Sequence, residues 1–582
     1  MDPLLSTRRL LEDYREKRRS PREVLELVYS RIQQGPERPV WIAVEPFERA
    51  LLALERAERH VPDGRLFGVP FAVKDNIDVA GLPTTAGCPE FAYLPERNAH
   101  AVERLIAEGA IVIGKTNLDQ FATGLVGTRT PYGVCSSVFD ERYISGGSSS
   151  GSAVAVARGQ VSFSLGTDTA GSGRVPAMFN GLVGLKPTKG LISTSGVVPA
   201  CRSLDCVSIF AQSIADAELV FDVAQGFDAA DPYSRAPSWA SGPGRDCLQI
   251  GVPTPSSLEF FGDGDNARLF AAAVQRFVEL GAEIVDVDLT PFRRAANLLY
   301  TGPWVAERLA AIGHFLEQRP EAVHPVVRSI VEQARRYSAR DAFEGQYELA
   351  ALKRLSDSVL GSVDALVVPT APTHYTIEAV LADPLQLNQN LGTYTNFVNL
   401  LDLSGLAIPT ARRDDGLPFG ITLLGPAFAD ARLAELGRRF LQQEEVPRSA
   451  TPGHVWIAVA GAHLSGQPLN HELTTRGARK IRSALTAPRY RLFALSTTPP
   501  KPGLVRTADA AHAIEIELWE LDERGFGAFV AGVPAPMTIG TVELEDGSLV
   551  KGFACEPHAL EGARDISEFG GWRAYLKAQA SA

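Results

Sequence analysis

The sequence predicts an α/β protein in which one large domain is followed by a smaller, β-rich domain. Over residues 1–445, short apolar runs alternate with helix-like segments, which is typical of a sheet with parallel strands and covering helices. Residues 446–454 are polar and contain proline, as expected for a linker. Over residues 455–582 the apolar runs are short and separated by turn signals, and this pattern favours a β-rich domain.

The elements of both domains follow from local signals. Ser20, Pro21 and Glu23 form a capping box with proline in the first turn, which predicts a helix over residues 20–34. Asn98 is the expected cap of a later helix. The other elements expected in the large domain are helices over 46–59, 98–108, 267–280 and 429–443, and strands over 67–73, 111–113, 248–252, 284–289, 365–369, 406–409 and 419–424. The small domain is expected to contain strands over 455–459, 491–495, 514–521, 529–533, 538–544 and 550–554, with a hairpin turn at 545–547.

Composition excludes several classes of protein. The formal net charge of −11 disfavours nonspecific binding to nucleic acid or to an anionic membrane. Six cysteines without a CxxC pair are too sparse for a disulfide scaffold or a zinc site and favour a reducing compartment. The chain shows no signal-peptide core and no membrane-spanning apolar run, so a cytoplasmic protein without a membrane partner is expected.

Two loops rich in glycine and serine, residues 146–152 and 166–174, flank a short apolar stretch. Glycine permits close backbone approach, and successive N–H groups in such turns form an anion site, which acyl transfer needs beside its nucleophile. Two other motifs fit less well. A nucleophile elbow needs a preceding strand, and residues 139–145 make a poor one. A phosphate-binding loop needs lysine where Ser172 stands.

Together with Phe-Ala-Val-Lys-Asp-Asn at residues 71–76, these loops resemble the amidase signature family. The resemblance implies a Ser-cisSer-Lys triad, with Ser172 as nucleophile, Ser148 as bridging serine and Lys74 as base. Ser148 and Lys74 precede Ser172 by 24 and 98 residues, and both spacings fit the family. The resemblance, which covers about residues 65–200, also implies a mixed sheet sandwiched by helices.

The triad has a clear physical requirement. A lysine accepts a proton only when it is neutral, and the apolar residues before Lys74 predict burial, which lowers a lysine pKa. The hydroxyl of Ser148 can accept a hydrogen bond from Ser172 and donate one to Lys74. The expected oxyanion donors are the backbone N–H groups of Thr169, Ala170, Gly171 and Ser172.

Three residues nearby are expected to support the site. Asp168 and Arg174 are predicted to pair beneath the nucleophile loop. In the family the region around residues 115–133 borders the substrate, so Gly124 is a candidate backbone contact, with a plain turn as the alternative.

The segment from Tyr300 to Arg308 resembles the substrate-recognition segment of the allophanate hydrolase branch of this family. There a tyrosine and an arginine eight residues later contact the substrate, a small urea-carboxylate. A guanidinium suits a carboxylate because it can bind it bidentately, and Tyr300 could bind the ureido group. The alternative is a helix face with Glu307 and Arg308 in solvent.

Residues 459–470, 540–544 and 551–553 resemble the C-terminal domain of the same branch, which is similar to a γ-glutamylcyclotransferase-type β-barrel. In that branch the domain is implied to decarboxylate the first product, which is expected to be N-carboxyurea. His463, in a glycine-rich turn after a strand, is the candidate residue, with a structural hydrogen bond as the alternative.

The resemblance therefore implies an allophanate hydrolase that releases ammonia and N-carboxyurea, with a net yield of ammonia and carbon dioxide. It implies no metal and no organic cofactor, and it favours a homodimer. No biotin or ATP-binding module is visible, so a separate urea carboxylase or an upstream amidohydrolase is the expected functional partner. Two alternatives stay open: an amidase of broader specificity, and a component of an amidotransferase that hands ammonia to a partner holding nucleic acid. The acidic balance and the C-terminal domain weigh against the second.

Overall fold

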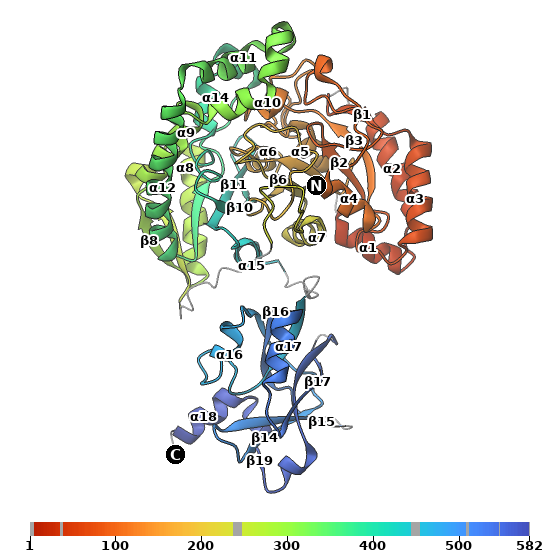
Figure 1. The fold of residues 1–582 in the computed structure, drawn as a ribbon, viewed down its shortest axis with the longest axis vertical. Coiled ribbons are helices and arrows are strands. Elements are labelled where there is room, and N and C mark those ends of the chain that lie inside the picture. The colour runs from red at the N-terminus through yellow and green to blue at the C-terminus, as the bar shows by residue number, and fades with distance from the viewer. Residues whose placement is uncertain are drawn as a thin grey trace. The chain divides into compact units, whose positions relative to one another are not determined.

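The computed structural model describes residues 5–34, 39–236, 247–443, 454–507, 511–545 and 547–580. The chain divides into two compact units, Met1–Glu444 and Glu445–Ala582 (Figure 1). The predicted linker over residues 446–454 lies outside the described residues, apart from His454, which begins a strand. Within the described ranges, no helix is both long enough and apolar enough to cross a membrane.

Unit 1 contains one sheet of eleven strands. They are β1 Trp41–Val44, β2 Pro70–Lys74, β3 Ile111–Thr116, β4 Phe163–Thr167, β5 Val183–Lys186, β6 Val207–Ala211, β7 Gln249–Pro253, β8 Glu283–Val287, β9 Ala365–Pro369, β10 Leu403–Arg412 and β11 Pro418–Pro426. Their order is β1-β3-β2-β4-β6-β5-β10-β11-β9-β7-β8. β2 runs parallel to β3 and β4, and β7 runs parallel to β8 and β9, whereas the other neighbours are antiparallel. The predicted mixed sheet is confirmed.

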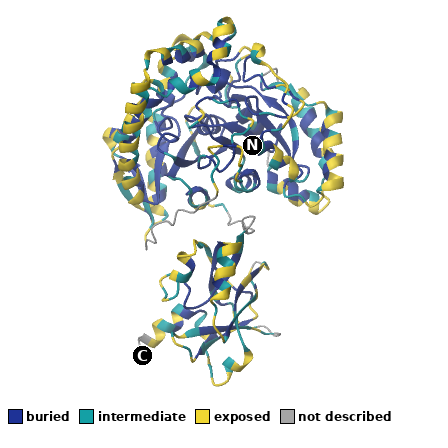
Figure 2. Cartoon of the chain, in the orientation of Figure 1, coloured by how far each residue is buried: buried dark blue, intermediate teal, exposed yellow. Residues whose placement is uncertain are grey.

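Helices cover both faces of this sheet. They are α1 Thr7–Arg15, α2 Pro21–Gln34, α3 Phe47–His60, α4 His100–Ala107, α5 Ser150–Ala157, α6 Arg174–Phe179, α7 Ile214–Ala224, α8 Gly264–Glu279, α9 Thr290–Tyr300, α10 Val305–Gln318, α11 Pro325–Glu332, α12 Ala339–Gly361, α13 Ile377–Ala382, α14 Gln386–Leu391 and α15 Asp430–Leu441. Side chains of a strand alternate between faces. In β2, Phe71 and Val73 join apolar residues of α4 and α7, whereas Ala72 joins residues of α2, α3 and α5. The central strands are therefore buried on both sides (Figure 2).

The parallel strands β2, β3 and β4 bring three polar residues to one edge of the sheet. The strands end at Lys74, Thr116 and Thr167, and all three residues are buried. In α/β sheets the carboxyl ends of parallel strands are the usual place for a ligand site. The two glycine- and serine-rich segments lie at this edge. Residues 146–149 lead into α5, and residues 168–173 follow the end of β4.

Local predictions in unit 1 have mixed outcomes. The capping box of α2 is confirmed, since Ser20 N–H donates to Glu23 at 2.8 Å and Glu23 N–H donates to the Ser20 hydroxyl at 3.3 Å. The prediction that Asn98 caps α4 is wrong. Its side-chain oxygen accepts from the N–H of Ala80 at 2.8 Å, and the helix begins at His100 without a side-chain cap.

Unit 2 is β-rich, as predicted. Its strands are β12 His454–Val459, β13 Arg479–Leu485, β14 Tyr490–Leu495, β15 Lys501–Arg506, β16 Glu515–Asp522, β17 Met537–Glu543, β18 Leu549–Cys555 and β19 Arg564–Asp565, and its helices are α16 His471–Thr474, α17 Glu523–Ala531 and α18 Trp572–Ala580. They form a five-stranded sheet, β13-β16-β12-β18-β17, and a three-stranded sheet, β15-β14-β19.

In unit 2, one predicted strand is the end of a helix, and one predicted turn lies partly outside the described residues. The strand expected over 529–533 is wrong, because these residues end α17 and the turn after it. Asp522 caps that helix by accepting from the N–H of Gly525, and a short apolar run cannot by itself distinguish a helix end from a strand. The hairpin turn at 545–547 includes Asp546, which lies outside the described residues. The flanking strands β17 and β18 do pair antiparallel, with Glu543 opposite Leu549.

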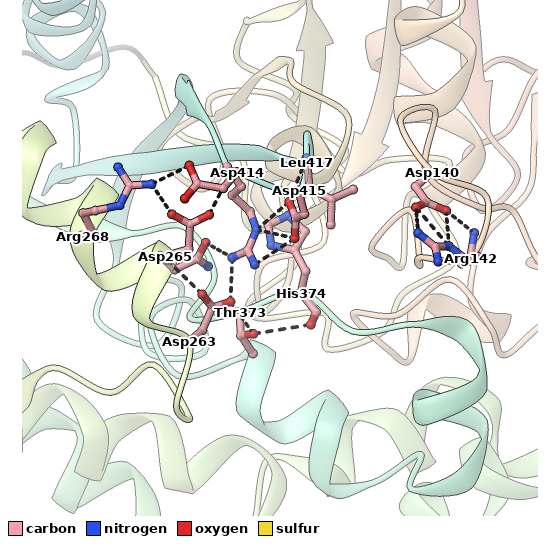
Figure 3. Close-up of polar contacts among 12 residues, drawn as sticks. Asp140, Arg142, Asp263, Asp265, Arg268, Thr373, His374, Asp414, Asp415 and Leu417 are labelled. Atoms are coloured by element: carbon pink, nitrogen blue, oxygen red, sulfur yellow. Dashed lines mark hydrogen bonds and ion pairs between the residues drawn. The ribbon is translucent and has the colours of Figure 1, made fainter.

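Charged side chains fasten the turn between β10 and β11 to the start of α8 (Figure 3). Arg413 donates to Asp263 at 2.6 Å and pairs with Asp415 at 3.0 Å. Asp263 also caps α8 through the N–H of Asn266 and accepts from the Thr373 hydroxyl at 2.8 Å. Because the Arg413 side chain is only 11% exposed, this network excludes much of the solvent that would weaken an ion pair.

We expect Arg413→Met to lower the urea midpoint of unit 1 unfolding, because it leaves the largely buried carboxylate of Asp263 without its cation. Such a loss typically costs about 1–3 kcal/mol. The matched control is Arg340→Met, which removes an exposed pair with Glu344 and should shift the midpoint little. Equal midpoints for the two variants would contradict a stabilising role of the Arg413 network.

Candidate active site

Lys74 is fully buried at the end of β2 and points its amine at two hydroxyl groups. Its Nζ lies 2.7 Å from Ser148 Oγ and 2.8 Å from Thr167 Oγ1. Asn76 donates to the same Thr167 hydroxyl at 3.3 Å. The amine is therefore oriented between the two loops that the sequence singled out.

The surroundings of Lys74 suit a base. Burial lowers the pKa of Lys74 to about 7, while the carboxylates of Asp119, Asp168 and Asp205 act in the opposite direction. None of these acids forms an ion pair with the amine among the described residues. A lysine with a pKa near 7 is substantially neutral at physiological pH and can accept a proton.

Ser148 lies two residues before the start of α5, and the peptide bond between Gly147 and Ser148 is cis. A side chain at Gly147 would not fit, since a Cβ there would lie 2.2 Å from a carboxylate oxygen of Asp119. Asp119 in turn accepts from the backbone N–H groups of Gly127 and Arg129, both at 2.9 Å, and its own N–H donates to the carbonyl of Ser148. Asp119 thus ties the loop over residues 119–129 to the bridging serine.

Ser172 lies in the loop after β4, which is shaped by the buried carboxylate of Asp168. Asp168 accepts from the N–H of Gly171 at 2.7 Å and forms a bidentate pair with Arg174, with both contacts at 2.9 Å. The predicted pair of Asp168 and Arg174 is therefore confirmed. Gly171 has φ +129°, and a Cβ there would lie 2.5 Å from the hydroxyl of Thr395, so this position requires glycine.

The structure brings Lys74, Ser148 and Ser172 to one edge of the sheet, with only half of the predicted hydrogen-bond chain in place. Ser148 is bonded to Lys74, whereas the hydroxyl of Ser172 donates to the carbonyl of Gly124 at 3.4 Å. A Ser172–Ser148 hydrogen bond is not present among the described residues. Catalytic hydrogen bonds are often formed fully only with substrate bound, so this geometry suits a resting enzyme.

The predicted oxyanion donors need one correction. The N–H of Gly171 already donates to Asp168 and is not free for a ligand in this conformation. The N–H groups of Thr169, Ala170 and Ser172 have no hydrogen-bond partner in the described part of the chain. Three of the four predicted donors therefore remain open beside the Ser172 hydroxyl.

Tyr300 and Arg308 lie together next to this loop. Tyr300 ends α9, and Arg308 is on α10 with only 2% of its surface exposed. The guanidinium donates to the hydroxyl of Thr123 at 2.7 Å and to that of Tyr300 at 3.3 Å. Thr123 directly precedes Gly124, whose carbonyl accepts the hydrogen bond of Ser172. Arg308 is therefore connected to Ser172 through Thr123 and Gly124. The alternative in which Glu307 and Arg308 face solvent is wrong, since Glu307 also binds Ser203.

Sequence analysis missed several residues at the site. Thr167 is the second partner of Lys74, and the sequence signal was its position at the end of β4, parallel to β2. Asp205 accepts from the Thr169 hydroxyl at 2.5 Å, and Arg129 donates to the carbonyl of Thr123 at 2.9 Å. Neither residue has a local pattern that would have revealed its contact.

In unit 2, His463 lines a pocket of about 200 Å³ together with Glu472, Lys501 and Phe553. Its Nε2 lies 3.1 Å from Glu472, and its ring stacks on Phe553 with centroids 5.0 Å apart. Burial lowers the pKa of His463, which favours the neutral imidazole. The structure thus gives His463 both a structural partner and access to a cavity.

The fold and the buried lysine with its serine loops define an amidohydrolase. The amidase family matches residues 23–434, and the allophanate hydrolase C-terminal domain matches residues 455–577. The chain therefore belongs to the amidase family, and its second unit is an allophanate hydrolase C-terminal domain.

Individual relatives agree with this assignment. Urea amidolyase of Saccharomyces cerevisiae is 46% identical over 544 residues, which cover 88% of this chain and 30% of that protein. The chain covers 32% of urea amidolyase of Lachancea kluyveri, so it spans only about a third of these curated relatives. The structure of Kluyveromyces lactis allophanate hydrolase is 42% identical with a TM-score of 0.77, covering 98% of this chain and 99% of that one. A glutamyl-tRNA(Gln) amidotransferase chain of Cyanothece is 31% identical over 78% of this chain and 99% of its own length.

The pKa of Lys74 predicts the pH dependence of amide hydrolysis. Only neutral Lys74 can act as base, so kcat/KM should fall about tenfold per pH unit as the pH drops below its pKa of about 7, and level off above it. The measurement is a pH profile between about pH 5 and 9 at constant ionic strength. A profile that stays flat through pH 7 would show that no group with this pKa acts as the base.

Proposed function

We propose that this chain is an allophanate hydrolase that uses Ser172, Ser148 and Lys74. The observation that carries the proposal is the buried guanidinium of Arg308 beside the nucleophile loop. In the described part of the chain no carboxylate lies within ion-pair distance of Arg308. Asp205 and Glu307 act on it only from farther away, and burial of a cation without a directly paired acid is unfavourable. An anionic substrate would supply a negative charge in direct contact with Arg308. The match of unit 2 to the allophanate hydrolase C-terminal domain supports allophanate as that anion.

The contacts support the following mechanism. Neutral Lys74 takes the proton of Ser148, which takes the proton of Ser172 once that hydroxyl turns from Gly124 toward Ser148. Ser172 attacks the terminal ureido carbonyl of allophanate, and the N–H groups of Thr169, Ala170 and Ser172 stabilise the oxyanion. The triad returns the proton to the leaving nitrogen, ammonia departs, and water hydrolyses the acyl-enzyme.

Recognition of the substrate is assigned to Tyr300, Arg308 and the backbone around Gly124. Arg308 binds the carboxylate and Tyr300 contacts the ureido group, which directs the far carbonyl toward Ser172. Because the guanidinium already has a fixed position on Thr123, little conformational entropy is lost on binding.

Atom balance corrects the predicted product. N-carboxyurea is allophanic acid itself, so it cannot be formed by hydrolysis of allophanate. Hydrolysis of the terminal amide consumes one water and gives ammonia and N-carboxycarbamate, which carries two carboxylates on one nitrogen. Protonation of that nitrogen with loss of carbon dioxide gives carbamate, which breaks down to ammonia and carbon dioxide. The expected net yield of ammonia and carbon dioxide is unchanged.

We assign the decarboxylation of N-carboxycarbamate to the pocket of unit 2. Lys501 suits a carboxylate. His463 is the candidate to deliver the proton to nitrogen, because its contact with Glu472 acts against burial and favours the protonated ring. The mainly apolar walls around them favour loss of a charged group as neutral carbon dioxide.

The two alternatives, a general amidase and an amidotransferase component, are less well supported. The amidotransferase relatives cover 66–78% of this chain, whereas K. lactis allophanate hydrolase covers 98%. A general amidase has no use for a buried arginine at the substrate position. We further propose a functional link to urea carboxylation, which would supply allophanate. The homodimer stays a prediction.

We expect the purified chain to release ammonium from allophanate, and Ser172→Ala and Lys74→Ala to lose at least about three orders of magnitude in kcat. Ammonium assay together with circular dichroism separates lost chemistry from lost fold. Release that persists in Ser172→Ala would reject the nucleophile. Absence of release in the folded wild type would reject the substrate.

Arg308→Ala should raise KM for allophanate by about two orders of magnitude, while changing KM for biuret little. Biuret is the fitting comparison because it replaces the carboxylate by a neutral amide of the same size. If both KM values rise equally, Arg308 does not recognise the carboxylate.

His463→Asn should leave the first ammonium release unchanged but delay carbon dioxide release, because the dicarboxylate would then decompose without assistance. Stopped-flow recording of ammonium and carbon dioxide in the same reaction measures this delay. An unchanged interval between the two products would reject His463 as the proton donor.

A further inference from the structure

We propose that Arg129 is a positioning residue for carboxylate selectivity that works with Arg308 through Thr123. The inference rests on the proposed function, since it concerns the anion that the site accepts. It adds a second cationic group to a site for which the sequence suggested one.

Arg129 is as deeply buried as Arg308 and equally without an acid. Its residue surface is 1% exposed, and in the described ranges no carboxylate lies within ion-pair distance of its guanidinium. Its Nε and that of Arg308 are both buried without a hydrogen-bond partner among the described residues. Two buried cations with open donors are costly unless an anion completes the site.

The two guanidinium groups hold the same residue from two sides. Arg129 donates to the Thr123 carbonyl at 2.9 Å, and Arg308 donates to the Thr123 hydroxyl at 2.7 Å. The next residue, Gly124, accepts the hydrogen bond of Ser172. Displacement of Thr123 would therefore move both the guanidinium of Arg308 and the resting position of the nucleophile.

Arg129 also faces space that a ligand can enter. It lines a cavity of about 510 Å³ together with Tyr300, Asn388 and Asn390. On its other side the guanidinium is anchored by the carbonyl of Pro384 at 2.6 Å. Arg129 is thus held by a carbonyl on each side and borders the same cavity as Tyr300.

Three acids act electrostatically on this pair, but among the described residues none of them contacts either guanidinium. Asp119 is the acid that acts electrostatically on Arg129. Its carboxylate oxygens accept hydrogen bonds from backbone N–H groups, including the N–H of Arg129 itself. Asp205 and Glu307, the acids that affect Arg308, are bonded to Thr169 and to Ser203. A monoanionic urea derivative therefore gains attraction from both guanidinium groups, and a neutral one gains none.

The test uses Arg129→Met and Arg129→Gln, which both remove the charge, and Arg129→Lys, which restores it. Gln keeps an N–H donor for the carbonyl contacts and serves if Met prevents folding. We expect the neutral variants to raise KM for allophanate at least about tenfold with little change in kcat, to raise KM for biuret less than about twofold, and Lys to recover part of the loss. Calorimetric binding of allophanate to the same variants in a Ser172→Ala background should follow KM.

Arg294→Met is the matched control, since Arg294 is an exposed arginine on α9 that pairs with Glu348, and it should change neither KM. Equal losses for allophanate and biuret, or unchanged selectivity in a folded Arg129→Gln, would overturn the inference while the proposed function stands. A wild-type chain that releases no ammonium from allophanate would overturn both.

Discussion

The candidate site depends on one lysine whose pKa is lowered by burial inside the protein. Lys74 has three carboxylates close enough to affect its pKa, yet its hydrogen bonds go to the hydroxyls of Ser148 and Thr167. Each acid is instead used to shape a loop: Asp119 holds residues 126–129, Asp168 holds the nucleophile loop, and Asp205 holds Thr169. A carboxylate in direct contact with the amine would stabilise its protonated form, so the contacts that occupy these acids also protect the reactivity of the base.

The specificity proposed for the site rests on the opposite arrangement, with two buried cations that no acid contacts among the described residues. Arg308 and Arg129 are both buried, and both are satisfied in part by the neutral oxygens of Thr123. Neutral acceptors orient a guanidinium without cancelling its charge. On both sides of the site, neutral partners bind charged groups: backbone N–H groups and hydroxyls bind the acids near Lys74, and the oxygens of Thr123 bind the two guanidinium groups. Asp168 differs in that it also pairs with Arg174.

Sequence reasoning located the residues whose pattern is local and missed those whose role is set by the sheet. Ser148, Ser172 and Lys74 occur in short runs with a recognisable order. Thr167 reaches Lys74 only because β2 and β4 are parallel, and Arg129 contacts the carbonyl of Thr123, six positions earlier, which no periodicity indicates. Gly171 is a predicted oxyanion donor, but its N–H donates to Asp168. Only the folded loop shows this hydrogen bond. The cap predicted at Asn98 is wrong for the same reason. Its side-chain oxygen accepts from the backbone N–H of Ala80 instead of capping α4.

The loop that carries Ser172 also depends on residues that are synthesised much later in unit 1. Thr395 packs against Gly171 and accepts from Arg174, and Asn399 donates to the carbonyl of Asp168 at 2.6 Å. β10, which follows these residues, pairs with β5 in the middle of the sheet. A nascent chain that carries Lys74, Ser148 and Ser172 but has not yet emerged from the ribosome past residue 400 lacks these contacts, so the packing around the Ser172 loop is completed only late in the synthesis of unit 1.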